Sequence, residues 1–186
     1  GVYPRPFQPR LPVWIAVGGT PQSVARAGAL GLPLALAIIG GEPHRFAPLF
    51  DLYRRSAETA GTDPARLATS INVHGFVAET TREAADTFYA PQAEVMNRIG
   101  RERGWPPTSR AQFDAARGAR GALFVGSPAE LVDKILASHE IFGMDRFLIQ
   151  MAIGVMDHGK LMKAIEILGD KVAPEVRKSL PATAPA

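Results

Sequence analysis

The stretch LPVWIAVGGTPQSVARAGALGL, residues 11–32, decides the fold class of this chain. A short apolar run ends in two glycines, and a helical pattern begins directly after Thr20 and Pro21. An unbroken apolar run of this length is typical of a strand buried on both faces, as in a parallel sheet. Thr20 is suited to cap the helix and Pro21 to be its first residue. The stretch therefore predicts a β-strand that passes through a glycine turn into an α-helix.

This succession of strand and helix recurs along the chain. After the strand at 13–17, further strands are predicted at residues 34–39, 68–78 and 146–153. After the helix at 20–30, further helices are predicted at residues 43–60, 80–103, 110–117, 128–142, 157–168 and 171–180. Thr80 with Glu83 and Ser127 with Glu130 form capping boxes, which mark two of the helix starts. Four strands alternating with helices indicate an α/β chain with parallel strands and right-handed crossovers.

Composition excludes several classes of protein. The chain has 186 residues, of which 46% are hydrophobic and 21% are charged, so one globular domain over 1–186 is expected. Residues 1–11 are rich in proline and are interpreted as a connector, and residues 181–186 as a disordered tail. Cysteine is absent, which rules out disulfides and thiolate metal sites. The cytoplasm is the expected location.

Charge and residue spacing also argue against several ligands. The net charge is only +3 and few aromatic residues accompany the arginines, so no nucleic-acid partner is predicted. Apolar runs are too short to cross a membrane. The four histidines lack the spacing of metal ligands, so no metal is expected.

Chain length leaves two architectures open. A complete (βα)₈ barrel needs about 250 residues, so this chain cannot form one alone. The four strands therefore belong either to half of such a barrel or to part of a doubly wound sheet that binds a phosphorylated ligand.

The glycine turn itself allows two interpretations. Free N–H groups and the helix macrodipole create an anion site where a strand leads into a helix. Gly18 and Gly19 have no side chain to obstruct a phosphate, and Thr20 and Ser23 can both offer hydroxyls. The spacing matches neither G-x-G-x-x-G nor a P-loop. The turn therefore either binds a phosphate or only connects the strand to the helix and caps the start of the helix.

Other candidates lie at the predicted carboxyl ends of the strands, where barrel enzymes place their functional groups. His74 is a candidate catalytic residue that could move a proton or line a substrate pocket; the alternative is a hydrogen-bonded structural histidine. Gly40 and Gly41 either admit a ligand or form a turn. Asp157, followed by His158, is either an acid–base group or a helix N-cap. The segment 96–121 is long for a connection between a strand and a helix. It is either a surface insertion or, as the family resemblance given below implies, a lid or wall near the mouth of a substrate pocket.

Four segments together carry a family resemblance, and they occur in the family's order. They are PRPFQPRLPVWIAVGGTPQSVARAGALGLPLALAIIGG (4–41), ALFVGSPAELVDKI (122–135), FGMDRFLIQM (142–151) and KLMKAIEILGDKVAPEVR (160–177). The ordered set resembles the luciferase-like family of flavin-dependent monooxygenases, and the likeness covers nearly the whole chain. Members of that family are TIM barrels about twice this long. The resemblance implies the C-terminal half of such a barrel, strands five to eight, as about four βα units.

The same resemblance implies a function and a cofactor site. Val17, Gly19, Thr20 and Ser23 correspond to residues around the FMN phosphate, and Gly18 belongs to the same turn. The implied parent is a bacterial monooxygenase that uses O₂ and reduced FMN, supplied by a partner flavin reductase, to oxygenate a small organic substrate. The N-terminal half of the barrel is the implied structural partner, and a homo-oligomer is expected.

Two alternatives to this function stay open. A branch of the family uses a deazaflavin coenzyme for hydride transfer without oxygen. Alternatively, the chain is a catalytically inactive half-barrel that self-associates, because a half-barrel leaves open sheet edges and an uncovered interior face.

Overall fold

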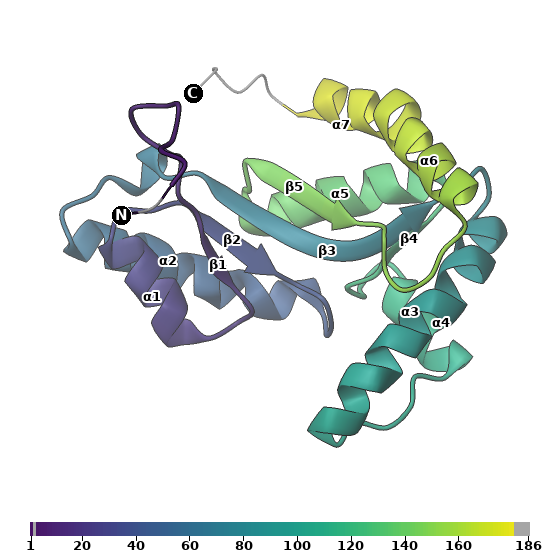
Figure 1. The fold of residues 1–186 in the computed structure, drawn as a ribbon. Helices are drawn as coiled ribbons and strands as arrows, with labels where there is room; N and C mark the ends of the chain where they lie inside the picture. Colours follow the sequence, from purple (N-terminus) through teal and green to yellow (C-terminus); the bar gives the residue numbers. More distant parts are fainter. Residues whose placement is uncertain (2, 181–186) are drawn as a thin grey trace.

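Five parallel strands form the centre of the fold (Figure 1). The computed structural model describes residues 1 and 3–180, so the predicted tail at 181–186 lies outside the described residues. The strands are β1 (Ile15–Val17), β2 (Leu34–Ala37), β3 (Thr69–Val77), β4 (Phe124–Gly126) and β5 (Arg146–Gln150). The α-helices are α1 (Pro21–Ala29), α2 (Ala47–Thr59), α3 (Thr81–Arg103), α4 (Arg110–Arg117), α5 (Pro128–Phe142), α6 (His158–Ile167) and α7 (Ala173–Ser179).

The strand order follows the sequence. β1 pairs with β2, and β2 pairs with the first half of β3, residues 69–72. β5 pairs with residues 70–74 of β3. The short β4 pairs with the last residues of β3, 75–77. A doubly wound sheet reverses its strand order at a switch point. The described strands show no such reversal, which argues against the doubly wound alternative.

The sequence-based elements are confirmed with four differences. The expected four strands become five, because Phe124–Gly126 forms a three-residue strand at the end of β3. The helix predicted at 43–60 begins as a 3-10 helix, η1 (Pro43–Phe46), before α2. The two last helices are joined by a π-helix, η3 (Leu168–Val172), without a loop between them. A shorter 3-10 helix, η2 (Pro64–Arg66), precedes β3.

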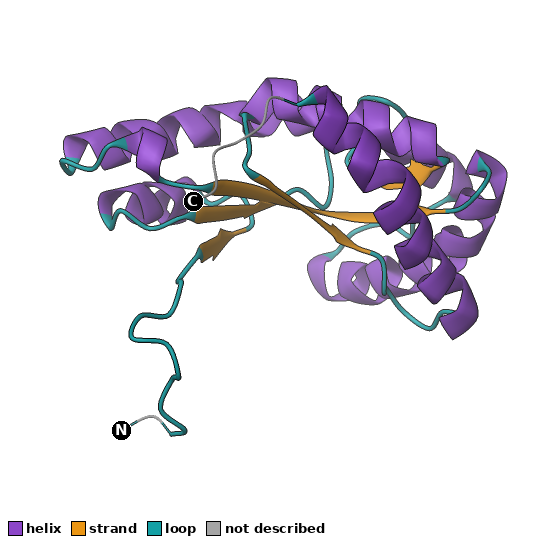
Figure 2. Cartoon of the chain, turned by 90° about the horizontal axis from the view of Figure 1, so that it is seen from above, coloured by secondary structure: helices purple, strands orange, loops and turns teal. Residues whose placement is uncertain are grey.

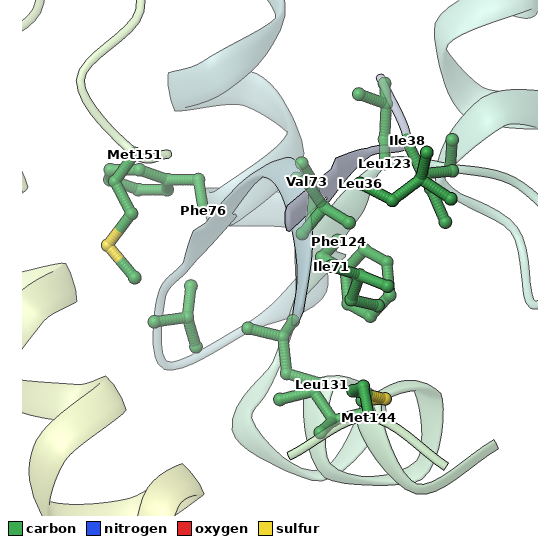
Figure 3. Packing of buried hydrophobic residues seen from close by; sticks show 14 of the residues in the cluster. Leu36, Ile38, Ile71, Val73, Phe76, Leu123, Phe124, Leu131, Met144 and Met151 are labelled. Carbon is green, nitrogen blue, oxygen red and sulfur yellow. The ribbon is translucent and has the colours of Figure 1, made fainter. Parts of the chain in front are cut away.

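One face of the sheet is covered by helices and carries the core. The side chains of β2 and β3 that point to this face are almost fully buried, as is that of Ile38 just after β2. The buried residues of the strands are Leu34, Leu36, Ile71 and Val73. Figure 3 shows Leu36, Ile71 and Val73 packed near Phe124, with Leu131 and Met144 below them. Figure 2 shows that helices lie mainly along one side of the strands.

The opposite face of the sheet is open after the end of β2 and along β5, whereas Ser70 and His74 of β3, on the same face, are buried. The strand register places Ala37, Asn72 and Leu148 in one row across β2, β3 and β5. Ile39 and Leu148 each expose 44% of their surface. Along β5 the residues alternate between exposed and half-buried, as expected for a strand with one covered and one open face.

Residues 81–123 are named the arm; their base belongs to the body of the fold, where Phe88, Phe113 and Leu123 are part of the hydrophobic core. The lower part of α3, with α4 beside it, projects away from the sheet (Figure 1). At its start, the Thr81 hydroxyl donates to the Glu130 carboxylate of α5. At its end, the Lys134 ammonium of α5 donates to the carbonyls of Arg117 (3.2 Å), Gly118 (2.7 Å) and Leu123 (2.6 Å). The arm is therefore fixed to α5 at both ends.

Among the helices that the structure describes, none is both long and apolar enough to cross a membrane.

Candidate functional site

The glycine turn between β1 and α1 forms the N-terminal end of a regular helix. Gly19 has a φ of +103°, in the region that L-residues rarely adopt, which explains a glycine at this position. Thr20 occupies the N-cap position with extended backbone, and Pro21 follows as the first helical residue. The Thr20 carbonyl accepts from the N–H groups of Ser23 (3.1 Å) and Val24 (3.2 Å). The sequence-based assignment of this helix start is confirmed.

Several donors at this turn have no partner within the protein. The Thr20 hydroxyl makes no capping hydrogen bond, unlike the Thr80 hydroxyl, which accepts from the Glu83 N–H at 3.2 Å. Within residues 1 and 3–180, the N–H groups of Gly19, Thr20 and Gln22 donate to no acceptor. The helix therefore presents three backbone donors and a free hydroxyl at its positive end.

Space and charge at this turn suit an anion. A Cβ placed on Gly18 would meet nothing within 4 Å, so the space above the turn is open. The first turn of α1 contains no acidic residue that would compete with a bound anion. Ser23 is half-buried one turn into the helix, whereas the Val17 side chain is buried in the core. Val17 can therefore face a ligand only through its backbone.

A second glycine turn lies beside the first and shares an aromatic contact with it. A Cβ on Gly19 would lie 3.6 Å from the Phe46 ring, and one on Gly41 would lie 4.0 Å from the same ring. Gly41 also has a positive φ of +78°, and a Cβ on Gly40 would meet nothing within 4 Å. Phe46 thus supports both turns. Sequence reasoning missed this role because Phe46 has the helical spacing of an ordinary core residue.

His74 lies on β3, opposite Gln150 of β5 in the register and two strands across the sheet from β1, which leads into the first glycine turn. Its side chain is 9% exposed, and burial lowers the pKa of its imidazole. Its Nδ1 atom is buried and has no hydrogen-bond partner among the described residues. The histidine is therefore held neutral near pH 7, with one nitrogen unused. This does not match the hydrogen-bonded structural histidine that the sequence left open as an alternative.

Asp157 is a helix cap. Its carboxylate accepts from the Lys160 N–H at 2.8 Å, and His158 is the first residue of α6. The geometry therefore favours the capping interpretation over an acid–base pair. Within the residues that the structure describes, no cluster of three or more His, Asp or Glu side chains could hold a metal ion.

Lys134 is a half-buried cation that the sequence did not single out. Burial lowers its pKa to about 8, and its ammonium lies 5.0 Å from the centre of the Phe124 ring. Its three carbonyl acceptors all lie at the end of the arm. These bonds assign it a structural role.

The family model for luciferase-like monooxygenases matches residues 2–145. This chain belongs to that family. The match begins before β1 and extends through α5, so it includes both glycine turns, β3 and the arm.

Solved structures share the fold at low sequence identity. The monooxygenase RslO1 from Streptomyces bottropensis has a TM-score of 0.70 and 22% identity, over 92% of this chain and 50% of that chain. The oxygenating constituent of 3,6-diketocamphane monooxygenase from Pseudomonas putida, in complex with FMN, has a TM-score of 0.64 and 19% identity, over 88% and 48%. The coenzyme F420-dependent tetrahydromethanopterin reductase from Methanopyrus kandleri has a TM-score of 0.61 and 18% identity, over 89% and 51%. The chain spans about half the length of these solved relatives.

The residues at the first glycine turn fit the phosphate of a flavin. Three free backbone N–H groups, the Thr20 hydroxyl and the open space at Gly18 together match the needs of a phosphate group.

Proposed function

We propose that this chain supplies the phosphate-binding half of a flavin-dependent oxidoreductase. The observation that carries the proposal is the first glycine turn, where the N–H groups of Gly19, Thr20 and Gln22 and the Thr20 hydroxyl have no acceptor or donor within the described residues. In this proposal Gly18 leaves room for the phosphate, Ser23 adds a second hydroxyl, and Val17 contributes backbone only. Reduced FMN, when bound, would supply the electrons for oxygenating a small organic substrate with O₂.

The proposal includes the architecture. The four strands β1, β2, β3 and β5 correspond to strands five to eight of a TIM barrel. The N-terminal half of the barrel is the structural partner of this chain. The sequential parallel order and the open face with Ile39 and Leu148 support this assignment. In a complete barrel that face would point inward and be covered by the remaining strands. His74 would then lie inside the barrel, where a neutral imidazole can accept a proton from substrate.

A second candidate is deazaflavin-dependent hydride transfer. Relatives that depend on coenzyme F420 share the fold about as closely as FMN-containing ones, with TM-scores of 0.61 and 0.64. The cofactor's absorption spectrum in the loaded protein would separate the two, because FMN and a deazaflavin absorb at different wavelengths.

A third candidate is a non-catalytic half-barrel that associates with a second copy of itself. The exposed edges of β1 and β5 and the open face favour it. Size-exclusion chromatography with light scattering tests this candidate, since a concentration-independent monomer would contradict it.

The decisive experiment titrates the chain with FMN and with riboflavin, following flavin fluorescence anisotropy. FMN should bind more tightly, because riboflavin lacks the phosphate. The double variant Thr20→Val with Ser23→Ala should weaken FMN binding by roughly tenfold or more, since hydrogen bonds to charged groups contribute about 1.5–3 kcal/mol each. The Gly169→Ala variant, on η3 and far along the chain from the turn, serves as the control and should leave FMN affinity unchanged. Equal affinity for the two flavins, or a double variant that keeps the preference, would contradict the phosphate assignment.

A further inference from the structure

Arg146, the first residue of β5, is a charged side chain in an otherwise uncharged sheet. The five described strands contain no other lysine, arginine, aspartate or glutamate. In the strand register this residue lies opposite Ser70, in one row with Ala16 and Ala35. The alternation along β5 places it on the open face of the sheet, together with Leu148. The strand residues of the open face therefore carry a single positive charge.

The Arg146 side chain reaches across the open face to the other edge of the sheet. Its guanidinium lies 4.7 Å from the centre of the ring of Trp14, the residue before β1. β1 and β5 are the outer strands of the series β1, β2, β3 and β5, so the contact passes over the starts of β2 and β3. Ser70, near the start of β3, has an exposed fraction of 0%, as expected for a residue beneath this contact. A cation–π contact thus joins the two edge strands across the open face.

The Arg146 guanidinium has no carboxylate partner. Within residues 1 and 3–180, no carboxylate oxygen lies within 4.0 Å of its nitrogen atoms. The neighbouring Asp145 carboxylate accepts from the Thr69 N–H instead, at 2.7 Å. The charge is tolerated because the Arg146 side chain is exposed to water. Covering the open face would remove this water, and a guanidinium without an anionic partner is costly to bury.

This charge discriminates between the two molecules that could cover the face. A second copy of the chain would bring a second Arg146 and no acidic strand residue, so two guanidinium groups would be enclosed together. A half-barrel of different sequence, with an aspartate or glutamate at the same height, would form an ion pair instead. Like charges at an interface disfavour the wrong partner, and opposite charges favour the right one. The chain covers 50% and 48% of the lengths of two solved relatives, so a second half-barrel also has the fitting size.

We propose that Arg146 selects the partner of the open face: a half-barrel with an acidic side chain at the amino-terminal end of its inner face, in preference to a second copy of this chain. In the closed barrel the carboxylate accepts from the guanidinium in its plane, and the Trp14 ring keeps its contact with the face of the same group. The inference rests on the half-barrel architecture of the proposed function, but not on the flavin site.

The Arg146→Glu variant of the same chain provides a half-barrel with the required acidic side chain. Sedimentation velocity compares the wild type, this variant and their equimolar mixture, all without flavin. The mixture should associate more tightly than either chain alone, by roughly tenfold or more, because only the mixture brings opposite charges together. Arg146→Met removes the charge and should self-associate more tightly than the wild type. A wild-type chain that self-associates as tightly as the mixture would overturn the proposal.

A matched charge change on the other side of the sheet is the control. Arg55 is an exposed residue of α2, a helix whose Phe50 and Tyr53 belong to the core. Arg55→Glu mixed with the wild type should associate no more tightly than the wild type alone. Conversely, Leu148→Lys in both chains should abolish pairing of the wild-type and Arg146→Glu chains, because it adds charge to the open face. Pairing that survives Leu148→Lys would place the contact elsewhere and refute the inference.

The outcomes also separate this inference from the proposed function. If Arg146→Met self-associates but the mixture gains nothing, the open face docks a half-barrel without selection by Arg146. If no combination associates, no half-barrel docks on this face. Either result overturns the inference, and since no flavin is present, the FMN titration succeeds or fails independently of both.

Discussion

Gly28 in α1 lies directly against the backbone of α2, and replacing it with alanine should destabilise the protein. A Cβ on Gly28 would lie 2.4 Å from the Tyr53 carbonyl oxygen and 2.9 Å from the Ser56 Cβ. Ordinary contacts of a Cβ begin near 3.4 Å, so α1 must move about 1 Å away from α2. Both obstructing groups belong to α2 itself, so no flexible side chain can turn aside.

Two effects of opposite sign decide how far Gly28→Ala changes the free energy of unfolding. Alanine is favoured over glycine inside a helix by about 1 kcal/mol. Overpacking a well-packed core costs about 1–3 kcal/mol, and the contact here is with backbone, which puts the cost at the upper end. The net result should be a loss of about 1–2 kcal/mol in the free energy of unfolding, equivalent to roughly 2–8 °C in Tm for a chain of this size.

Gly169 provides the matched control for this prediction. It lies in η3, and a Cβ there would meet nothing within 4 Å. Gly169→Ala should therefore stabilise the protein by up to about 1 kcal/mol through helix propensity alone. Both changes can be measured by urea unfolding with circular dichroism as the signal. Each should shift the urea concentration at the midpoint while the m-value, the slope of free energy against urea concentration, stays constant. A Gly28→Ala protein that is as stable as the wild type, or shifted in the same direction as Gly169→Ala, would refute the steric argument.

Two further predictions concern single side chains. Thr80→Val should lower the free energy of unfolding by about 1 kcal/mol because it removes a capping hydrogen bond, whereas Thr20→Val should leave it nearly unchanged because that hydroxyl caps nothing; equal losses in urea unfolding would contradict this contrast. For Lys134, burial lowers the folded-state pKa from 10.5 to about 8, so the unfolded chain binds more protons between these two pH values. The wild type should therefore gain stability relative to Lys134→Met as the pH rises from 8 to 10.5, by up to about 3 kcal/mol; a stability difference that stays constant between pH 7 and pH 10 would show that the ammonium is not desolvated.

The sequence predicts the parts of the fold that depend on local patterns. The glycine turn after β1, the caps at Thr80, Ser127 and Asp157, and the order of strands and helices follow from short stretches of the chain. β4 was not predicted because three residues carry too little periodicity, and only its pairing with the end of β3 makes it a strand.

The rest of the candidate site depends on contacts between distant residues. Phe46 joins two turns that lie more than twenty residues apart along the chain. Lys134 is a residue type normally found at exposed helical positions, and its contact with the Leu123 carbonyl, made where the arm returns, could not be predicted from spacing. No spacing rule identifies a hollow whose walls come from residues 39–40, α3, α4 and the segment before β4.

The attachment of the arm at both ends has a consequence for how this fold can change. Thr81 with Glu130 fixes the departure of the arm, and Lys134 fixes its return. Phe88, Phe113 and Leu123 of the arm belong to the hydrophobic core, so the sheet depends on the base of the arm but not on its exposed tip. Lengthening a tethered loop costs little, about 0.6 kcal/mol for each doubling. Residues 101–107 at the tip are exposed, so this segment can be lengthened or replaced while the core contact of Phe113 and the glycine turn at α1 stay the same.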